Sequence, residues 1–239
     1  MEITMSELIV TIDALTGTVL IEDHDDLPQR LRDSLAAFLG PGTEFGCARP
    51  LVVLPPPEAP ERDGLGVIYL RVSGYYHNSL VEGPGRRSSL LVSGCELACR
   101  GCWVPFLHPT DAGTLIPVER LADALLDPAY KRDGVSILGG EPMQQPEGLL
   151  VLIRALRVRG CPHILVYSGY TYERLQRMAG QQSAIDAILD EIDVVIDGPY
   201  VQALSDGAGP WTGSANQRVI DLVETRRVGR VVIVQVRSC

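Results

Sequence analysis

Short runs of consecutive apolar residues recur through the second half of the chain, and each ends in a glycine-rich or polar cluster. These runs are Ser88–Ser93, Val135–Leu138, His163–Tyr167 and Asp193–Ile196. Helical stretches are predicted between or after them at 117–126, 146–159, 171–178 and 183–190, from apolar residues spaced three and four apart. Continuous apolar strands that alternate with helices predict an α/β fold built on a parallel sheet.

The first sixty residues show a different pattern. Residues 6–22 predict two strands joined by a turn at Gly17, and a helix is expected between Asp25 and Gly40. A short strand at Leu51–Leu54 precedes the segment PPPEAPERDG, which has the stiff, polar composition of a linker. We therefore predict a small α+β accessory module over residues 1–60 and a main domain over residues 61–239.

The remaining segments of the main domain have weaker patterns. GVIYLRVS, which begins at Gly66, predicts a strand followed by a loop through Tyr75, Tyr76 and His77. At the end of the chain, Arg218–Val223 and Val231–Val236 also predict strands.

Composition narrows the classes of protein that fit. The chain has 239 residues, 46% of them hydrophobic, and a net charge of −9, which argues against a general nucleic-acid binder. We find no apolar run long enough to span a bilayer and no secretory signal at the N-terminus. The cysteines are clustered rather than spread as a disulfide framework, so we expect a cytoplasmic protein.

The most informative stretch is SGCELACRGCW at 93–103. It holds Cys95, Cys99 and Cys102 as a CxxxCxxC triplet, and Trp103 adds an apolar wall that would limit solvent access. Three thiolates on so short a loop can converge on one metal centre. An iron–sulfur cluster is usually held by four thiolates, so three would leave one iron open to a substrate. The alternatives are a chance cluster of buried thiols and a structural zinc site, whose fourth ligand would be Cys161, Cys47 or His108.

Three further polar clusters follow predicted strands, at Gly139–Pro142, Ser168–Tyr170 and Asp197–Pro199. Ligand sites in parallel α/β folds lie at the carboxyl edge of the sheet, so we expect these clusters to share one site with the cysteines. Taken singly, each is also explained by a tight turn or a helix cap. Asn216 and Gln217 offer amide groups to a ligand, although polar residues between strands are usually turn residues.

Taken together, these motifs resemble the radical S-adenosylmethionine (SAM) superfamily. EGPGRRSSLLVSGCELACRGCW, SILGGEPMQQ, ILVYSGYTYERL, VVIDGPY and GSANQRVIDL occur in this order. They are similar to the activating proteins of anaerobic ribonucleotide reductase and other glycyl-radical-enzyme activases. The resemblance covers about residues 66–223 and leaves residues 1–60 outside it.

The resemblance implies a partial (β/α)6 barrel, a [4Fe-4S] cluster on Cys95, Cys99 and Cys102, and SAM bound to the open iron. It places the methionyl end of SAM at Gly139, Gly140, Glu141 and Pro142. Ser168 and Gly169 would lie near the ribose, Asp197 near the cofactor, and Asn216 and Gln217 near the adenosine side.

Three functions are weighed from these implications. The first is reductive cleavage of SAM to a 5′-deoxyadenosyl radical that takes a hydrogen atom from a glycyl radical enzyme. The second is the same radical chemistry on a small molecule or peptide in a biosynthetic pathway. The third is a non-enzymatic interaction protein that binds zinc or a cluster. The two enzymatic functions require an electron donor such as flavodoxin or ferredoxin, and none involves a membrane or nucleic acid.

Overall fold

A computed structural model describes residues 10–12, 19–21 and 66–234, and the chain divides into two compact units, Met1–Leu54 and Pro55–Cys239. In the first unit, β1 (Val10–Ile12) pairs antiparallel with β2 (Val19–Ile21), within the two predicted strands. The helix and strand predicted between Asp25 and Leu54, and the linker after them, lie outside the described residues.

The second unit is built on a seven-stranded sheet in the order β5-β3-β4-β6-β7-β8-β9. Strands β4, β6, β7 and β8 pair parallel, whereas β3 and β9 run antiparallel to their neighbours, so the sheet is mixed rather than wholly parallel as predicted. The fold is therefore α/β, and closure into a partial (β/α)6 barrel stays a prediction. The strands are β3 (Tyr69–Ser79), β4 (Arg87–Val92), β5 (Thr114–Pro117), β6 (Gly134–Gly139), β7 (Ile164–Tyr167), β8 (Val194–Asp197) and β9 (Arg218–Asp221).

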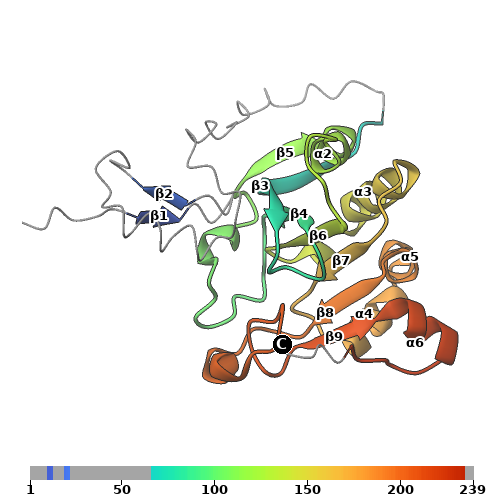
Figure 1. The fold of residues 1–239 in the computed structure, drawn as a ribbon. Coiled ribbons are helices and arrows are strands. Elements are labelled where there is room, and N and C mark those ends of the chain that lie inside the picture. The colour runs from blue at the N-terminus through green and yellow to red at the C-terminus, as the bar shows by residue number, and fades with distance from the viewer. Residues whose placement is uncertain (1–9, 13–18, 22–65, 235–239) are drawn as a thin grey trace, which may run out of the picture. The chain divides into compact units, whose positions relative to one another are not determined.

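Helices pack along one face of this sheet, where Figure 1 shows α2, α3 and α5 side by side. The apolar faces predicted for the first two helices are buried there, for example at Leu121 and Leu152. Proline at the first position of α3 and a left-handed Gly160 just beyond its end fit its limits. The helices are α2 (Val118–Leu125), α3 (Pro146–Val158), α4 (Tyr172–Ala179), α5 (Ser183–Glu191) and α6 (Leu222–Val228).

Two predicted segments differ from the structure. The loop expected at Tyr75–His77 is wrong, because register shifts let β3 continue beyond Gly74, where Tyr76 is buried and pairs with Ser89. The strand expected at Arg218–Val223 ends at Asp221, whose carboxylate accepts a hydrogen bond from the Glu224 amide and so caps α6. Of the strand predicted at 231–236, the described part contributes one bridge, between Ile233 and Ile220.

The other face of β7, β8 and β9 carries a second apolar cluster, away from the helices. Leu165, Val194, Ile196 and Val219 form it, and Tyr167, Trp211 and Val234 pack against it. Because side chains alternate along a strand, Asp197 lies on the opposite face from Ile196. This cluster forms part of the surface on which the candidate site is built.

No helix in the described ranges combines the length and the hydrophobicity needed to cross a membrane.

Candidate functional site

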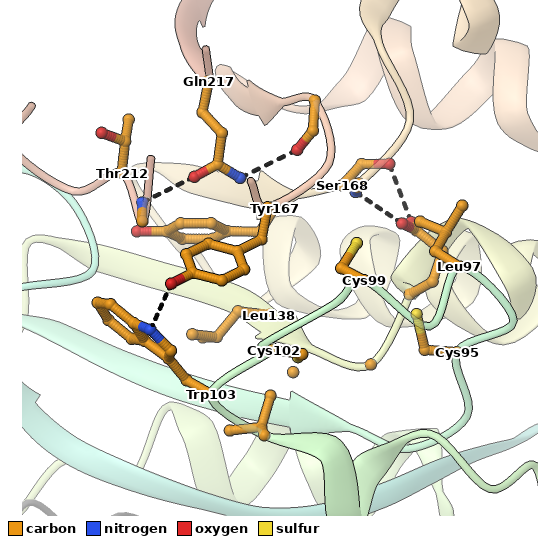
Figure 2. Close-up of a pocket in the computed structure, with 18 of the residues that line it drawn as sticks. Cys95, Leu97, Cys99, Cys102, Trp103, Leu138, Tyr167, Ser168, Thr212 and Gln217 are labelled. Atoms are coloured by element: carbon orange, nitrogen blue, oxygen red, sulfur yellow. Dashed lines mark hydrogen bonds between the residues drawn. The ribbon is translucent and has the colours of Figure 1, made fainter. Parts of the chain in front are cut away.

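A cavity of about 490 Å³ lies at the carboxyl edge of the parallel strands. All four of the polar clusters predicted after strands β4, β6, β7 and β8 contribute residues to its wall, as Figure 2 shows for Cys95, Cys99, Cys102 and Ser168. The predicted site residues that line it are Cys95, Cys99, Cys102, Trp103, Gly139, Gly140, Glu141, Ser168, Gly169 and Gln217. Their roles in binding stay predictions.

The cysteine loop turns its thiols inward through an unusual backbone. Cys95, Leu97 and Cys99 are partly buried, whereas Glu96, Ala98 and Arg100, between and after them, are exposed. Positive φ angles at Gly94 (94°), Ala98 (44°) and Gly101 (75°) wind the chain tightly enough for this alternation. The start of the loop is fixed by two backbone hydrogen bonds, from the Gly94 amide to Leu107 O and from the Cys95 amide to His108 O.

The glycine pair after β6 packs directly against this loop. A Cβ atom on Gly140 would lie 2.3 Å from the carbonyl oxygen of Gly94, and one on Gly139 would lie 2.6 Å from that of Val92. The Glu141 amide also donates to Gly94 O at 2.8 Å, which extends the contact between β4 and β6 beyond the strands. Glycine is thus required at Gly139 and Gly140 by backbone packing alone. At Gly169 an added Cβ would lie 2.4 Å from Leu97 Cδ1, the end of a side chain that can move aside.

Glu141 is a carboxylate enclosed by hydrogen-bond donors. It is 1% exposed and accepts from Ser168 Oγ (2.9 Å), the Gly169 amide (2.7 Å) and the Met143 amide (3.0 Å). Burial raises its pKa to about 7, although these three hydrogen bonds act in the opposite direction. The last of them caps the short helix η3 (Pro142–Gln144), so Glu141 is both a cap and a wall of the cavity.

The donor set fits an iron–sulfur cluster held by three thiolates. Cys95, Cys99 and Cys102 are free thiols on one cavity, and burial raises the pKa of the Cys95 thiol, which a bound metal would reverse. Of the other ligands considered, His108 lines the cavity, whereas Cys161 is buried elsewhere, with its Sγ near His163 O at 3.6 Å. Cys47 lies outside the described residues. Within residues 66–234, no three His, Cys, Asp or Glu side chains are grouped around a position for a single metal ion.

The loop between β8 and β9 contacts the outer side of the cysteine loop. Trp103 Nε1 donates to Tyr200 Oη at 3.0 Å, and the two rings meet edge to face at 5.7 Å (Figure 2). Gln202, in the same β8–β9 loop, packs closely against Gly101 of the cysteine loop, because a Cβ added to Gly101 would lie 2.5 Å from Gln202 Oε1. Trp103 lines the cavity but remains 72% exposed, so it lies at the cavity's outer rim.

Three of the predicted residues do not line the cavity, namely Pro142, Asp197 and Asn216. A fourth, Gln217, lines it, but its amide group is already hydrogen-bonded within the protein. Asp197, 1% exposed, accepts from the Tyr172 amide at 2.7 Å and pairs with Arg218 on the helix-covered face. Asn216 is exposed and donates to Pro199 O, and Pro142 is buried at the start of η3. Gln217 lines the cavity, but its Oε1 accepts from the Gly213 amide and its Nε2 donates to Gly198 O.

Sequence reasoning missed most of the apolar wall. Leu138, at the end of β6, and Tyr167, at the end of β7, line the cavity, as Figure 2 shows. Alternation along β7 was the available signal for Tyr167, because it shares a face with Leu165. No comparable pattern marks the lining residues that lie on loops, which are Val81, Glu82, Leu97, Val104, Tyr200, Trp211 and Thr212.

Comparisons with known proteins agree with this donor set. The family model described as a 4Fe-4S single cluster domain matches residues 81–220. The anaerobic ribonucleoside-triphosphate reductase-activating protein of Haemophilus influenzae is 36% identical over 150 residues, which are 60% of this chain and 92% of that protein. The protein of the same name from Escherichia coli K12 is 36% identical over 152 residues, 61% of this chain and 94% of that protein.

A second type of relative shares a shorter segment. A putative glycyl-radical enzyme activating enzyme of Haemophilus influenzae is 35% identical over 94 residues, or 38% of this chain and 36% of that protein.

The family model of the 4Fe-4S single cluster domain, matched at residues 81–220, covers more than half of this chain and includes all three cysteines of the cavity. The chain therefore belongs to the 4Fe-4S single cluster domain family, among the radical SAM activating enzymes, whose cofactors are a [4Fe-4S] cluster and S-adenosylmethionine.

Proposed function

We propose that this protein activates a glycyl radical enzyme by radical SAM chemistry. The observation that carries the proposal is the single cavity on which three free thiols meet Gly139, Gly140 and Glu141. When bound, the reduced cluster supplies an electron to SAM, which yields methionine and a 5′-deoxyadenosyl radical that takes a hydrogen atom from the substrate. The chain's own contribution is to hold, orient and shield these groups.

Cys95, Cys99 and Cys102 would hold the cluster, and their number leaves one iron without a protein ligand. Glu141 lies beside them with its carboxylate fixed by Ser168 and Gly169, which suits it to face the amino group of an amino acid. Holding the amino acid of SAM at the open iron would place its sulfonium next to the electron donor, which is an effect of proximity. Leu91, Leu97, Leu138 and Tyr167 supply an apolar lining that limits water around the reacting atoms.

A protein substrate is favoured by the names of the relatives. The Haemophilus and Escherichia proteins are named as activators of a reductase, and this chain matches more than nine-tenths of each. We infer that the substrate here is likewise a glycyl radical enzyme. We also infer that the electron comes from a flavodoxin or ferredoxin, and that the protein works in the cytoplasm, where its thiols stay reduced.

The first test is anaerobic reconstitution. The wild type should bind about four irons per chain and, with a strong reductant, release 5′-deoxyadenosine from SAM. Cys99→Ala should lose both properties. Cys161→Ala is the matched control, because Cys161 does not line the cavity, and it should keep both. Colourless protein that contains zinc and no iron, or loaded protein that leaves SAM intact, would contradict the proposal.

The second test addresses the substrate. When the protein is incubated with SAM, reductant and the glycyl radical enzyme of its source cell, electron paramagnetic resonance should show a persistent glycyl radical in that enzyme. The signal should be absent with Cys99→Ala. If SAM is cleaved but no such radical forms in any glycyl radical enzyme of the cell, the substrate is instead a small molecule or peptide.

A further inference from the structure

Trp211 stands out among the cavity residues by its backbone. Its φ of 66° lies in the left-handed region, which within residues 66–234 only two other non-glycine residues adopt, Asn78 and Ala98. A bulky side chain rarely accepts this conformation, because its Cβ crowds the following carbonyl group. Strain of this kind persists where the surroundings fix the residue, and it is commonest at functional sites.

The surroundings do fix Trp211 in the cavity wall. Tyr167 Oη, at the end of β7, donates to the carbonyl oxygen of Trp211 at 2.9 Å. On either side, the Gly209 amide donates to Thr212 Oγ1 at 2.8 Å and the Gly213 amide donates to Gln217 Oε1 at 2.7 Å. In Figure 2, Tyr167, Thr212 and Gln217 lie in the same part of the cavity wall. The left-handed turn is therefore held from β7 and from the segment that leads into β9.

The Trp211 side chain is part of both the apolar cluster and the cavity. It is partly buried, packs against the cluster on the inner face of β7, β8 and β9, and lines the same cavity as the three cysteines. The polar side chains beside it have their hydrogen bonds satisfied, because Gln217 joins Gly213 to Gly198 and Thr212 Oγ1 bonds to Gly209. This stretch of wall thus presents aromatic surface rather than free hydrogen-bonding groups.

A flat, uncharged ligand group matches such a wall. With its amino acid beside Glu141 and its ribose near Ser168, as the sequence predicts, SAM would extend its adenine toward Gln217 and Trp211 in the same cavity. Purine bases stack well on aromatic side chains, with little need for hydrogen bonds to their edges. We propose that the indole of Trp211 is the surface on which the adenine of SAM stacks, and that Tyr167 and Gln217 are positioning residues that hold it there. This inference rests on the proposed function, because it takes SAM as the ligand.

The two tryptophans of the chain permit a direct test, because both line the cavity. Trp103→Phe leaves Trp211 as the sole tryptophan, and Trp211→Phe leaves Trp103. In cluster-loaded protein, titration with SAM and with 5′-deoxyadenosine should change the emission of the Trp211-only protein, whereas free methionine should not. Unchanged Trp211 emission at saturating SAM, with binding established by equilibrium dialysis, would overturn the stacking proposal.

Affinity provides a second readout. By equilibrium dialysis, Trp211→Leu should bind SAM about tenfold more weakly, while Trp211→Phe should stay within a few-fold of wild type, since it keeps an aromatic face. Tyr167→Phe keeps its ring but loses the bond to the Trp211 carbonyl, so it should weaken binding several-fold and make Trp211 more accessible to acrylamide. Tyr200→Phe, which removes the acceptor of Trp103 instead, should leave the acrylamide accessibility of Trp211 unchanged.

These measurements distinguish a failure of the stacking proposal from a failure of the proposed function. Iron content and the cluster absorbance of every variant should equal those of the wild type, which checks that the site is intact. Wild-type binding of SAM together with equal binding by Trp211→Leu would overturn this inference and leave the proposed function standing. Loaded wild type that binds no SAM would overturn both.

Discussion

At the level of single residues, the cavity depends on glycines that let backbones touch. Gly140 has no room for a side chain, because its Cβ would fall 2.3 Å from the backbone oxygen of the loop that carries the cysteines. Gly140 and its neighbour Gly139 also line the cavity. Close packing and exposure to the ligand are thus properties of one short segment, and a substitution there acts on both.

Gly140→Ala is therefore expected to disturb the cysteine loop. The added methyl group must push β6 and Gly94 apart, which should destabilise the protein by about 1–3 kcal/mol and lower the iron bound on reconstitution. Thermal unfolding and iron analysis measure the two effects. Gly180→Ala is the control, since Gly180 has an ordinary helical φ and its added methyl group would meet only Arg177 O, at 3.5 Å. Equal iron content in both variants would contradict the expectation.

Glu141 should make stability depend on pH. Its pKa is raised by burial from 4.5 to about 7, so between these values the folded protein binds a proton that the unfolded chain has released. Stability then falls as pH rises through this window, by up to about 3 kcal/mol for a shift of this size. Glu141→Gln cannot titrate and removes this contribution.

Urea unfolding of the cluster-free protein, in reducing buffer from pH 4.5 to 8, measures this effect. The difference in unfolding free energy between Glu141→Gln and wild type should grow in favour of the variant as the pH rises. Curves that stay parallel over the whole range would show that the pKa of Glu141 is not raised in the folded protein.

At the level of elements, one charged network joins the last two strands to α4. Arg218 of β9 bonds to Asp197 of β8 and to Glu173 of α4, and Asp197 also accepts from the Tyr172 amide. The Arg218 guanidinium lowers the pKa of Glu173 to about 2, and it compensates the buried carboxylate of Asp197. The network explains why Asp197 follows a strand at the site edge without lining the cavity.

Arg218→Gln should accordingly destabilise the protein by about 2–4 kcal/mol, since it leaves Asp197 buried without its partner. Arg154→Gln is the matched control, because it breaks an ion pair with Glu191 in which the arginine is 56% exposed, and it should cost at most about 0.5 kcal/mol. Chemical denaturation of the two variants compares them directly. Similar losses in both would mean that the Asp197 pair contributes no more than a surface ion pair.

The elements that sequence could predict are those with a strong period. The apolar runs of β4, β6, β7 and β8 and the apolar faces of α2 and α3 are read correctly because burial on a sheet or helix imposes those patterns. The position of Asp197 could also have been predicted from the alternation of side chains along β8. Because Ile196 lies on the face that carries the cavity, Asp197 must lie on the face covered by the helices. The contribution of Trp211 to the cavity had no such signal, because it depends on contacts between the β8–β9 loop and Tyr167, distant in sequence.

At the level of the whole molecule, the candidate site belongs to one of the two compact units. The cavity and the seven-stranded sheet lie within Pro55–Cys239, and the matched family domain covers residues 81–220. The activating proteins of Haemophilus influenzae and Escherichia coli are matched over 92% and 94% of their lengths by about 150 residues of this chain. We infer that the first unit is an accessory module that is dispensable for building the site.

A protein that comprises residues 55–239 should therefore fold and assemble its cluster without Met1–Leu54. The sheet and its helices share an extensive apolar core among the described residues of this unit, so the shortened protein should unfold cooperatively. After anaerobic reconstitution it should bind about four irons and release 5′-deoxyadenosine at a rate within a few-fold of the full chain. Cys99→Ala in the shortened protein gives the background. If the shortened protein is soluble and cooperative but releases no 5′-deoxyadenosine, the first unit contributes to the site itself. If it aggregates when the full chain does not, the two units share a core.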